Sequence, residues 1–301
     1  MLLEDGKPRE FTIFDSPATQ GRMPLELVLL FDANPPISFF WDPVEVFRFI
    51  PEWTEEMSRE ILTADTANIR ISVYRCARET LYPMLRATTD AAQLTDTLRS
   101  LLKPEWRGPG RGGEPIALSL PAQRQTVPRG AFTNDYPTSP FISQEYRGWP
   151  MEAAIGTLNE MAATQDKVAR VMVMFSEGIG ATTTIPEDLG NQALDLGIPI
   201  YPVATNYQGH IDSAYPRNLF RMREFESLGK MTGGREVEYT QINAATLRKI
   251  LSGVKNHGLS EYVVGFVPPA SSGTSRQHRL EIKLASKSSG SLEGGKRRAI
   301  Y

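Results

Sequence analysis

Apolar and polar positions follow one another along this chain in patterns that predict alternating strands and helices. Residues 25–32 read LELVLLFD and are apolar on both faces until an aspartate ends them, which is typical of a buried parallel strand. Residues 69–74 alternate polar and apolar side chains and include β-branched residues, which predicts a second strand. Thr89 and Asp90 carry the side-chain oxygens that cap helices, so a helix is expected from there to about Leu102.

Helical and strand patterns alternate along most of the remaining chain. Strands that alternate with helices form parallel sheets with helices packed on both faces. We therefore predict an α/β fold with a doubly wound, mostly parallel sheet flanked by helices. The predicted elements are helices at 44–62, 151–164, 186–196, 218–231 and 244–257, and strands at 168–175, 198–203 and 236–239.

The two ends of the chain predict a second, smaller β unit. Residues 9–15 have the pattern of a strand that follows a turn at Asp5 and Gly6. Residues 261–267 and 279–284 have strand character with no helix between them, so we expect an antiparallel hairpin that pairs with the N-terminal strand. The predicted organisation is an N-terminal β segment at 1–20, a larger domain at 21–258, and a C-terminal hairpin at 259–301.

Residues 103–150 differ in composition from the rest of the larger domain. They are rich in glycine and proline, and their arginines outnumber their acidic residues. A loop of this length within a compact domain is uncommon and is usually either functional or disordered. We interpret the segment as an insertion, either a solvated linker with a mild positive bias or a functional loop.

Composition excludes several classes of protein. The chain has 301 residues, of which 41% are hydrophobic and 23% charged, as in ordinary globular proteins. A net charge of -2 provides no overall field that attracts nucleic acid or an anionic membrane. No apolar run approaches the roughly 20 residues of a membrane helix, and the first residues lack the pattern of a signal peptide.

Cysteine and histidine give no local metal signature. Cys76 is the single cysteine, so the chain has no internal disulfide and no cysteine-rich metal site. The three histidines, His210, His257 and His278, are far apart and lack ligand spacing such as i, i+4. We therefore expect neither zinc nor cysteine chemistry and read the histidines as surface or core residues.

Two acidic residues stand at the ends of predicted parallel strands. Asp32 closes the strand at 25–32, and Glu177 follows the strand at 168–175. In doubly wound sheets, ligands bind beyond the carboxyl ends of the strands, near the point where the strand order reverses. Carboxylates in such loops are suitable ligands for a hard divalent cation. The alternative is that Asp32 caps the following turn and Glu177 faces solvent.

The order of these elements resembles a known family. The strand that ends in Asp32, the segment FSEG at 175–178 and the segment LGKMTGGR at 228–235 resemble a von Willebrand factor type A (vWA) domain. The chain ends, EDGKPR at 4–9 and EYVVGFVPP at 261–269, are similar to the vWA-related domain proteins first catalogued in Acidobacteria. The resemblance covers nearly the whole chain apart from 103–147 and implies a Rossmann-like vWA fold.

The resemblance also implies a metal-ion-dependent adhesion site, which is degenerate in this chain. Asp32 matches the first residue of the family's Asp-x-Ser-x-Ser loop, whereas Asn34 and Pro36 replace the two serines. The apolar Trp149 lies where a threonine is expected, and Glu177 replaces an aspartate. Because Mg²⁺ demands near-octahedral oxygen ligands, these changes predict that Mg²⁺ or Mn²⁺ binds Asp32, Asn34 and Glu177 weakly or not at all.

The leading functional hypothesis is a non-enzymatic protein-interaction or adhesion module without a required cofactor. Its ligand-binding face would be formed by Asp32, Asn34, Trp149, Ser176 and Glu177, and the sequence does not identify the protein partner or the oligomeric state. One alternative is a metal-assisted hydrolase that uses Asp32 and Glu177, although neither has a histidine or lysine base beside it. The other is a salt-sensitive nucleic-acid binder that uses the arginine-rich insertion and the basic tail at 271–301.

The same resemblance suggests a hypothesis for the cellular location of the protein. Relatives in the family are commonly exported, and this chain begins close to what resembles the middle of an N-terminal β unit. One hypothesis is that Met1 is an internal start and that a signal peptide precedes it, which would place the protein outside the cytoplasm.

Overall fold

The computed structural model describes most of the regular elements of the chain. The described residues are 1–15, 24–32, 69–77, 80–101, 112–118, 150–164, 166, 168–176, 186–204, 225, 227–234, 251–254, 263–268, 277–284 and 296–300. The chain forms two compact units, one of residues 1–23 with 256–301 and one of residues 24–255. The predicted helix at 44–62 and the predicted strand at 236–239 lie outside the described residues.

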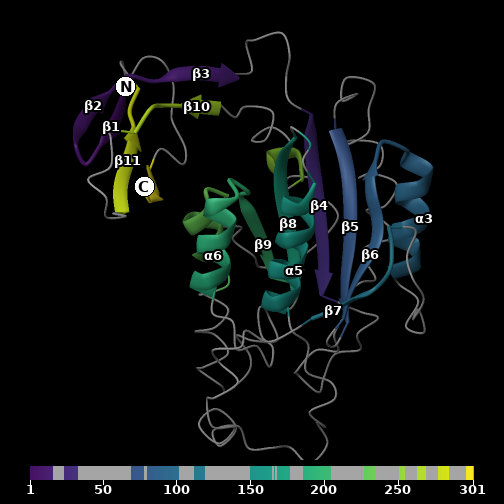
Figure 1. The fold of residues 1–301 in the computed structure, drawn as a ribbon. Coiled ribbons are helices and arrows are strands. Elements are labelled where there is room, and N and C mark those ends of the chain that lie inside the picture. Colours follow the sequence, from purple (N-terminus) through teal and green to yellow (C-terminus); the bar gives the residue numbers. More distant parts are fainter. Residues whose placement is uncertain are drawn as a thin grey trace, which may run out of the picture. The chain divides into compact units, whose positions relative to one another are not determined.

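In the part of the chain that the structure describes, the larger unit is built on a sheet of six strands (Figure 1). Its spatial order is β7-β6-β5-β4-β8-β9. Strands β4, β5, β8 and β9 are parallel, while β6 pairs antiparallel with β5 and with β7. The predicted mostly parallel, doubly wound α/β sheet is therefore confirmed. The strand bounds are β4 Leu25–Asp32, β5 Ile69–Ala77, β6 Thr80–Thr88, β7 Ile116–Ala117, β8 Ala169–Ser176 and β9 Ile200–Ala204.

Strand β4 is the centre of the hydrophobic core. It pairs with β5 on one side and β8 on the other, and all eight of its residues are buried. A strand with neighbours on both edges and helices on both faces is mostly apolar, which explains the run from Leu27 to Phe31. Phe31 on β4 stacks on its register partner Phe175 on β8, with ring centroids 4.6 Å apart and planes inclined by 3°.

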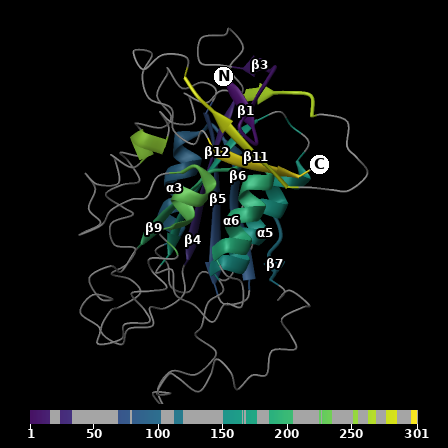
Figure 2. The same cartoon turned by 90° about the vertical axis from the view of Figure 1, so that its left-hand side faces the viewer.

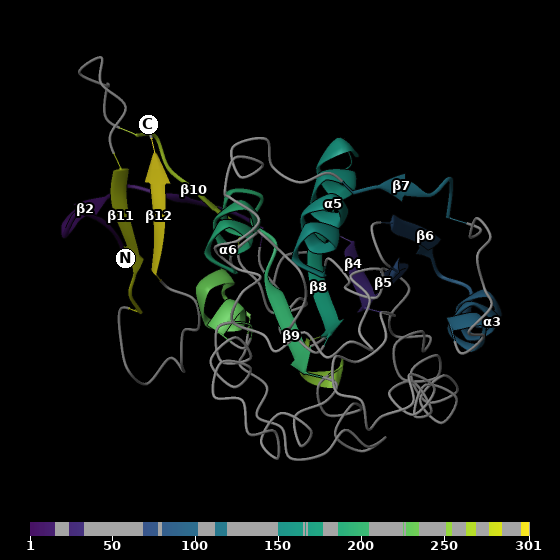
Figure 3. The same ribbon diagram turned by 90° about the horizontal axis from the view of Figure 1, so that it is seen from below.

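Helices cover both faces of this sheet, as Figures 2 and 3 show from two directions. Helices α5 (Pro150–Ala163) and α6 (Pro186–Asp195) lie side by side on one face, joined by a 2.7 Å hydrogen bond from Gln192 Nε2 to Asn159 Oδ1. Helix α3 (Ala91–Leu101) lies on the other face against β5 and β6. Phe225 and residues 227–232, and separately residues 251–254, are also helical.

Helix α3 begins where its sequence predicts. Asp90 Oδ1 accepts backbone hydrogen bonds from Ala92 at 2.8 Å and Gln93 at 3.3 Å, so it caps the first turn. Leu94, Leu98 and Leu101 are buried at the spacing of one helix face. None of the helices in the described part of the chain has the length and apolar content needed to cross a lipid bilayer.

Strand β6 was not predicted. Its sequence contains Pro83, which has no N–H to donate and normally argues against a strand. Partner strand β7 pairs only with Thr80 and Leu81, so Pro83 lies beyond the reach of that ladder. Strand β7 also falls within 103–150, so this part of the predicted insertion is a strand, and Pro150 already belongs to α5. Residues 102–111 and 119–149 lie outside the described residues.

A buried polar network joins the amino ends of the central strands. Glu26 on β4 accepts hydrogen bonds from Ser72 Oγ on β5 at 2.5 Å and from Arg170 Nε on β8 at 2.9 Å. Arg170 also pairs with Asp166 and donates to Thr164 Oγ1 at 2.5 Å. A buried carboxylate is tolerated only when hydrogen bonds and opposite charge replace its lost hydration. This network therefore links the amino ends of β4, β5 and β8.

The smaller unit is made from both ends of the chain. Four antiparallel strands form a sheet in the order β12-β11-β1-β2, and β3 pairs antiparallel with β10. Asp5 and Gly6 form the β1–β2 turn with φ angles of 48° and 81°, the left-handed conformation that tight hairpins require. The bounds are β1 Leu2–Glu4, β2 Lys7–Arg9, β3 Thr12–Asp15, β10 Val263–Gly265, β11 Gln277–Ile282 and β12 Lys296–Ile300.

The expected hairpin between residues 261–267 and 279–284 is wrong. Strand β10 pairs with β3, whereas β11 pairs with β1 and β12. The apolar β1 explains the difference, because its Leu2 and Leu3 are buried in the sheet that β11 completes. The N-terminal residues expected to form one strand at 9–15 instead form parts of β2 and β3. A small sheet shared by the two chain ends, as the predicted fold included, is present.

Candidate functional site

The carboxyl ends of β4 and β8 form the point where the strand order of the larger sheet reverses. After β4 the chain adds β5, β6 and β7 on one side, and it then crosses to add β8 and β9 on the other. Such reversal points are where doubly wound sheets bind their ligands. Asp32 is the last residue of β4, and Ser176 is the last residue of β8. We call this pair of strand ends the strand-end edge.

Asp32 and Ser176 are in direct contact. Ser176 Oγ donates a hydrogen bond of 2.7 Å to Asp32 Oδ2. The exposed fraction is 9% for Asp32 and 0% for Ser176, so the bond lies in a largely dry environment. Hydrogen bonds to a carboxylate are among the stronger ones in proteins, and they matter most where water is excluded. The contact therefore holds the aspartate in one orientation.

The aromatic stack one residue earlier supports this geometry. Successive side chains of a strand point to opposite faces. Phe31 and Phe175 therefore face the side of the sheet opposite to Asp32 and Ser176. Because the two rings are stacked in register, the ends of β4 and β8 cannot slide past each other without losing aromatic contact. The stacked rings therefore fix the register of β4 and β8 next to Asp32 and Ser176.

A buried cation lies on the neighbouring strand. Arg75 on β5 is the register partner of Phe31, and its exposed fraction is only 7%. Burial lowers the pKa of the Arg75 guanidinium, while the proximity of Tyr82, its register partner on β6, acts in the opposite direction. Cys76, the next residue, is buried and stands in register with Asp32. By this register Arg75 shares the face of Phe31, and Cys76 shares the face of Asp32 and Ser176.

The amino end of α5 lies toward the same edge. Thr164, just after α5, contacts Arg170 near the amino end of β8, which places the end of the helix there. A helix of 14 residues extends about 21 Å, comparable to the length of β8, so α5 begins near the carboxyl ends of the strands. Its first turn contains Glu152, whose exposed fraction is 4%. A carboxylate in the first turn is favoured by the partial positive charge of a helix N-terminus.

Two of the five residues predicted for the ligand-binding face are described, and the structure brings these two together. They are Asp32 and Ser176, which the sequence placed at strand ends without indicating a bond between them. Asn34, Trp149 and Glu177 lie outside the described residues. Their participation, and the predicted metal ligation by Asn34 and Glu177, stay predictions.

The described donor set does not make a complete site for a hard cation. Mg²⁺ requires six oxygen ligands in near-ideal octahedral geometry, some of which can be water. The described side chains that meet at the strand-end edge supply one carboxylate and one hydroxyl, and these already bind each other. Asn34 and Glu177, the other predicted ligands, lie outside the described residues, so metal binding at this edge stays a prediction.

Comparisons with known proteins give distant structural likenesses. No protein-family model matches the sequence, and no curated protein matches it. The vWF domain of the type V pili tip protein Mfa5 from Porphyromonas gingivalis is 10% identical, with a TM-score of 0.47, and the match covers 82% of this chain and 98% of that one. Manganese-loaded TRAP protein from Plasmodium vivax is 9% identical, with a TM-score of 0.41, and the match covers 100% and 97%.

A larger structure of Mfa5, which contains its three N-terminal domains, also matches. It is 12% identical with a TM-score of 0.34, and the match covers 54% of this chain but only 21% of that chain. The chain thus spans about a fifth of that three-domain protein.

Proposed function

We propose that this chain is a non-enzymatic protein-interaction module with a vWA-like fold, and that its partner binds at the strand-end edge. The observation that carries the proposal is the buried bond between Ser176 and Asp32 at the point where the strand order reverses. In sheets of this kind the loops beyond that point form the ligand-binding surface. The face would include Asn34, Trp149 and Glu177 together with these two residues.

The Asp32–Ser176 pair is poorly suited to catalysis. Activated serines normally donate their proton to an imidazole, which an aspartate in turn orients. Here the hydroxyl of Ser176 donates directly to the carboxylate of Asp32, which is a much weaker base than imidazole. The contact thus stabilises the ends of two strands without producing a strong nucleophile. It supports a binding role more than a hydrolytic one.

The domain organisation is part of the same proposal. Residues 21–258 would form the binding domain, including the insertion at 103–150, and residues 1–20 with 259–301 would form the β unit. The two compact units, with their division near residues 23 and 256, support it. We further propose that binding depends on loop contacts and is largely independent of Mg²⁺ and Mn²⁺.

Metal independence is tested by thermal unfolding of the full chain in millimolar Mg²⁺ or Mn²⁺ and in EDTA. A ligand bound only by the native state raises the free energy of unfolding by RT ln(1 + [L]/Kd), about 2.7 kcal/mol at a hundredfold excess over Kd. We expect no difference that depends on Asp32, so any shift between the conditions should be the same in Asp32→Ala as in the parent. A clear rise in the unfolding midpoint that Asp32→Ala abolishes would show a functional metal site and contradict this part of the proposal.

Partner binding is tested by affinity capture followed by measurement of the captured protein's affinity for defined variants. Asp32→Asn and a deletion of residues 119–148, which leaves β7 in place, should weaken binding at least tenfold. Glu26→Gln is the matched control, because Glu26 is a buried carboxylate on the same strand that also accepts a serine hydroxyl, but at the opposite end. Equal affinity of all three variants would contradict binding at the strand-end edge.

A further inference from the structure

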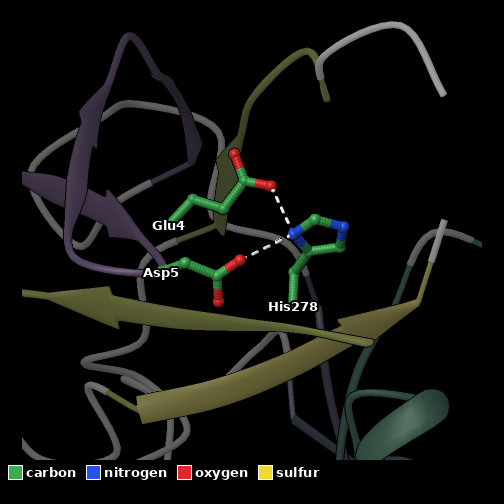
Figure 4. A group of neighbouring side chains, drawn as sticks. All are labelled: Glu4, Asp5 and His278. Carbon is green, nitrogen blue, oxygen red and sulfur yellow. Dashed lines mark hydrogen bonds and ion pairs between the residues drawn. The ribbon is translucent and has the colours of Figure 1, made fainter. Parts of the chain in front are cut away.

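Three groups that can bind a metal converge in the smaller unit (Figure 4). Glu4 ends β1, Asp5 occupies the β1–β2 turn, and His278 lies on β11. Nδ1 of His278 is 2.9 Å from Glu4 Oε1 and 2.9 Å from Asp5 Oδ2. The three ligand atoms all lie within 4.8 Å of one another. Figure 4 shows both carboxylates directed at the same ring nitrogen.

Each carboxylate is held in place through its second oxygen. Glu4 Oε2 accepts a hydrogen bond from Arg9 Nε on the neighbouring strand β2. Asp5 Oδ1 accepts one from the backbone N–H of Arg279 at 2.8 Å, and the N–H of Asp5 donates to the carbonyl of Arg279, also at 2.8 Å. Partners of this kind, which orient the ligand groups from behind, accompany metal sites in proteins. Both carboxylates are therefore oriented by a partner on the side away from His278.

We propose that Glu4, Asp5 and His278 bind a divalent first-row transition metal, for which Zn²⁺ is the appropriate probe. A ring nitrogen carries at most one proton, so Nδ1 cannot donate a full hydrogen bond to both carboxylates. A dication in the place of that proton interacts with all three groups. It also adds positive charge beside the two carboxylates, of which Glu4 has a side-chain exposure of 2% and is already paired with Arg9.

The ligand types favour zinc over calcium or magnesium. Zinc binds imidazole nitrogen and carboxylate oxygen at about 2.0–2.2 Å, whereas calcium and magnesium prefer oxygen alone. Ligand atoms in a tetrahedral zinc site are about 3.3–3.5 Å apart, so each 2.9 Å contact has to open by roughly half an ångström. Water completes the fourth position. It can enter on the side of Asp5, whose side-chain exposure is 45%.

No short sequence motif predicts this site, because Asp5 and His278 are 273 residues apart in the chain. Pairing of β1 with β11 brings Glu4 opposite Leu280, two residues from His278. A bound metal would therefore link the N-terminal hairpin to a strand near the end of the chain. This inference concerns the smaller unit and does not depend on the function proposed for the strand-end edge.

The test is calorimetric titration of the full chain with ZnCl₂ after removal of metals by EDTA dialysis, together with thermal unfolding with and without Zn²⁺. We expect one equivalent of Zn²⁺ to bind and to raise the unfolding midpoint, with a much smaller effect of Mg²⁺. His278→Gln should abolish binding, and Asp5→Asn should weaken it at least tenfold. Asparagine is well tolerated at the positive φ of 48°, so the turn is preserved in that variant.

Two further variants serve as controls, and circular dichroism verifies that each variant folds. His257→Gln removes another of the three histidines and should leave Zn²⁺ affinity unchanged. Asp32→Asn should also leave it unchanged, because Asp32 belongs to the other unit. Retained affinity in folded His278→Gln, equal affinity for Mg²⁺, or loss of binding in Asp32→Asn would each overturn the assignment. The first two outcomes leave the proposed interaction function untouched.

Discussion

The hydroxyl of Ser72 on β5 donates a hydrogen bond of 2.5 Å to the buried carboxylate of Glu26 on β4. This bond anchors the amino end of the central strand. The other end of β4 has a similar pair, in which Ser176 donates to Asp32. The two pairs differ in their surroundings, since Glu26 also binds Arg170 and that arginine binds Asp166. The Glu26 pair therefore belongs to a structural network, and it supplies a matched reference for the strand-end edge.

Glu26→Gln should lower the free energy of unfolding by about 2–3 kcal/mol. The substitution removes the charge that Arg170 faces, and hydrogen bonds to charged groups contribute roughly 1.5–3 kcal/mol. Asp166 remains to pair with Arg170, which limits the loss. Urea unfolding measures the change. A loss below about 0.5 kcal/mol would show that the network contributes little to stability.

Asp166 should make the protein more sensitive to acid. Desolvation acts to raise its pKa, but the hydrogen bond and charge of Arg170 outweigh that effect, so the pKa of Asp166 lies below its usual value. Its stabilisation is therefore fully present above the ordinary aspartate pKa of about 4 and is lost as the pH falls through the lower folded-state value. Urea midpoints should fall less steeply on acidification in Asp166→Asn than in the parent. Parallel acid profiles would contradict this assignment.

Tyr74 should destabilise the fold at alkaline pH. Burial raises its pKa to about 12, while the charge of Arg86 acts to lower it. In the unfolded chain the phenol ionises near pH 10, so stability is fully present below that pH and falls between about 10 and 12, by at most about 1.4 kcal/mol per pH unit. Tyr74→Phe should flatten this decline in urea unfolding measured across alkaline pH. An unchanged slope would mean that other groups cause it.

Gly234→Ala should be severely destabilising or prevent folding. A Cβ atom at this position would lie 2.1 Å from the carbonyl oxygen of Ile200, which is backbone and cannot move aside cheaply. We expect a loss of about 3 kcal/mol or more, the upper range for overpacking. Gly253→Ala is the matched control, because nothing lies within 4 Å of its Cβ position and residues 251–254 are helical. That variant should gain about 0.5–1 kcal/mol in chemical unfolding.

The sequence pattern was sufficient to locate elements that are buried along their whole length. The strand at residues 25–32 was placed correctly because a central strand is apolar on both faces. Strand β6 was missed because Pro83 carries a local signal against strands, and only the short reach of β7 shows why it is tolerated. Which strands pair in the smaller unit depends on contacts between chain ends, and local patterns do not encode these.

The candidate site was predictable in position but not in its contacts. Asp32 and Ser176 were placed at strand ends by pattern alone, yet their hydrogen bond depends on the register that pairs Phe31 with Phe175. A shift of one residue would turn the serine to the other face of the sheet. The cluster around His278 was missed for a related reason. Its ligands come together only after β1 and β11 pair, so no spacing along the chain reveals them.

The position of β1 between β2 and β11 has a consequence for the order of events during synthesis. Strands β1 and β2 are synthesised before the larger unit, whereas β11, which covers the other edge of β1, is synthesised after it. A lone two-stranded hairpin is marginally stable in water. Residues 24–255 can therefore fold while the nascent hairpin still lacks its neighbour, and the small sheet closes only after β11 has been made.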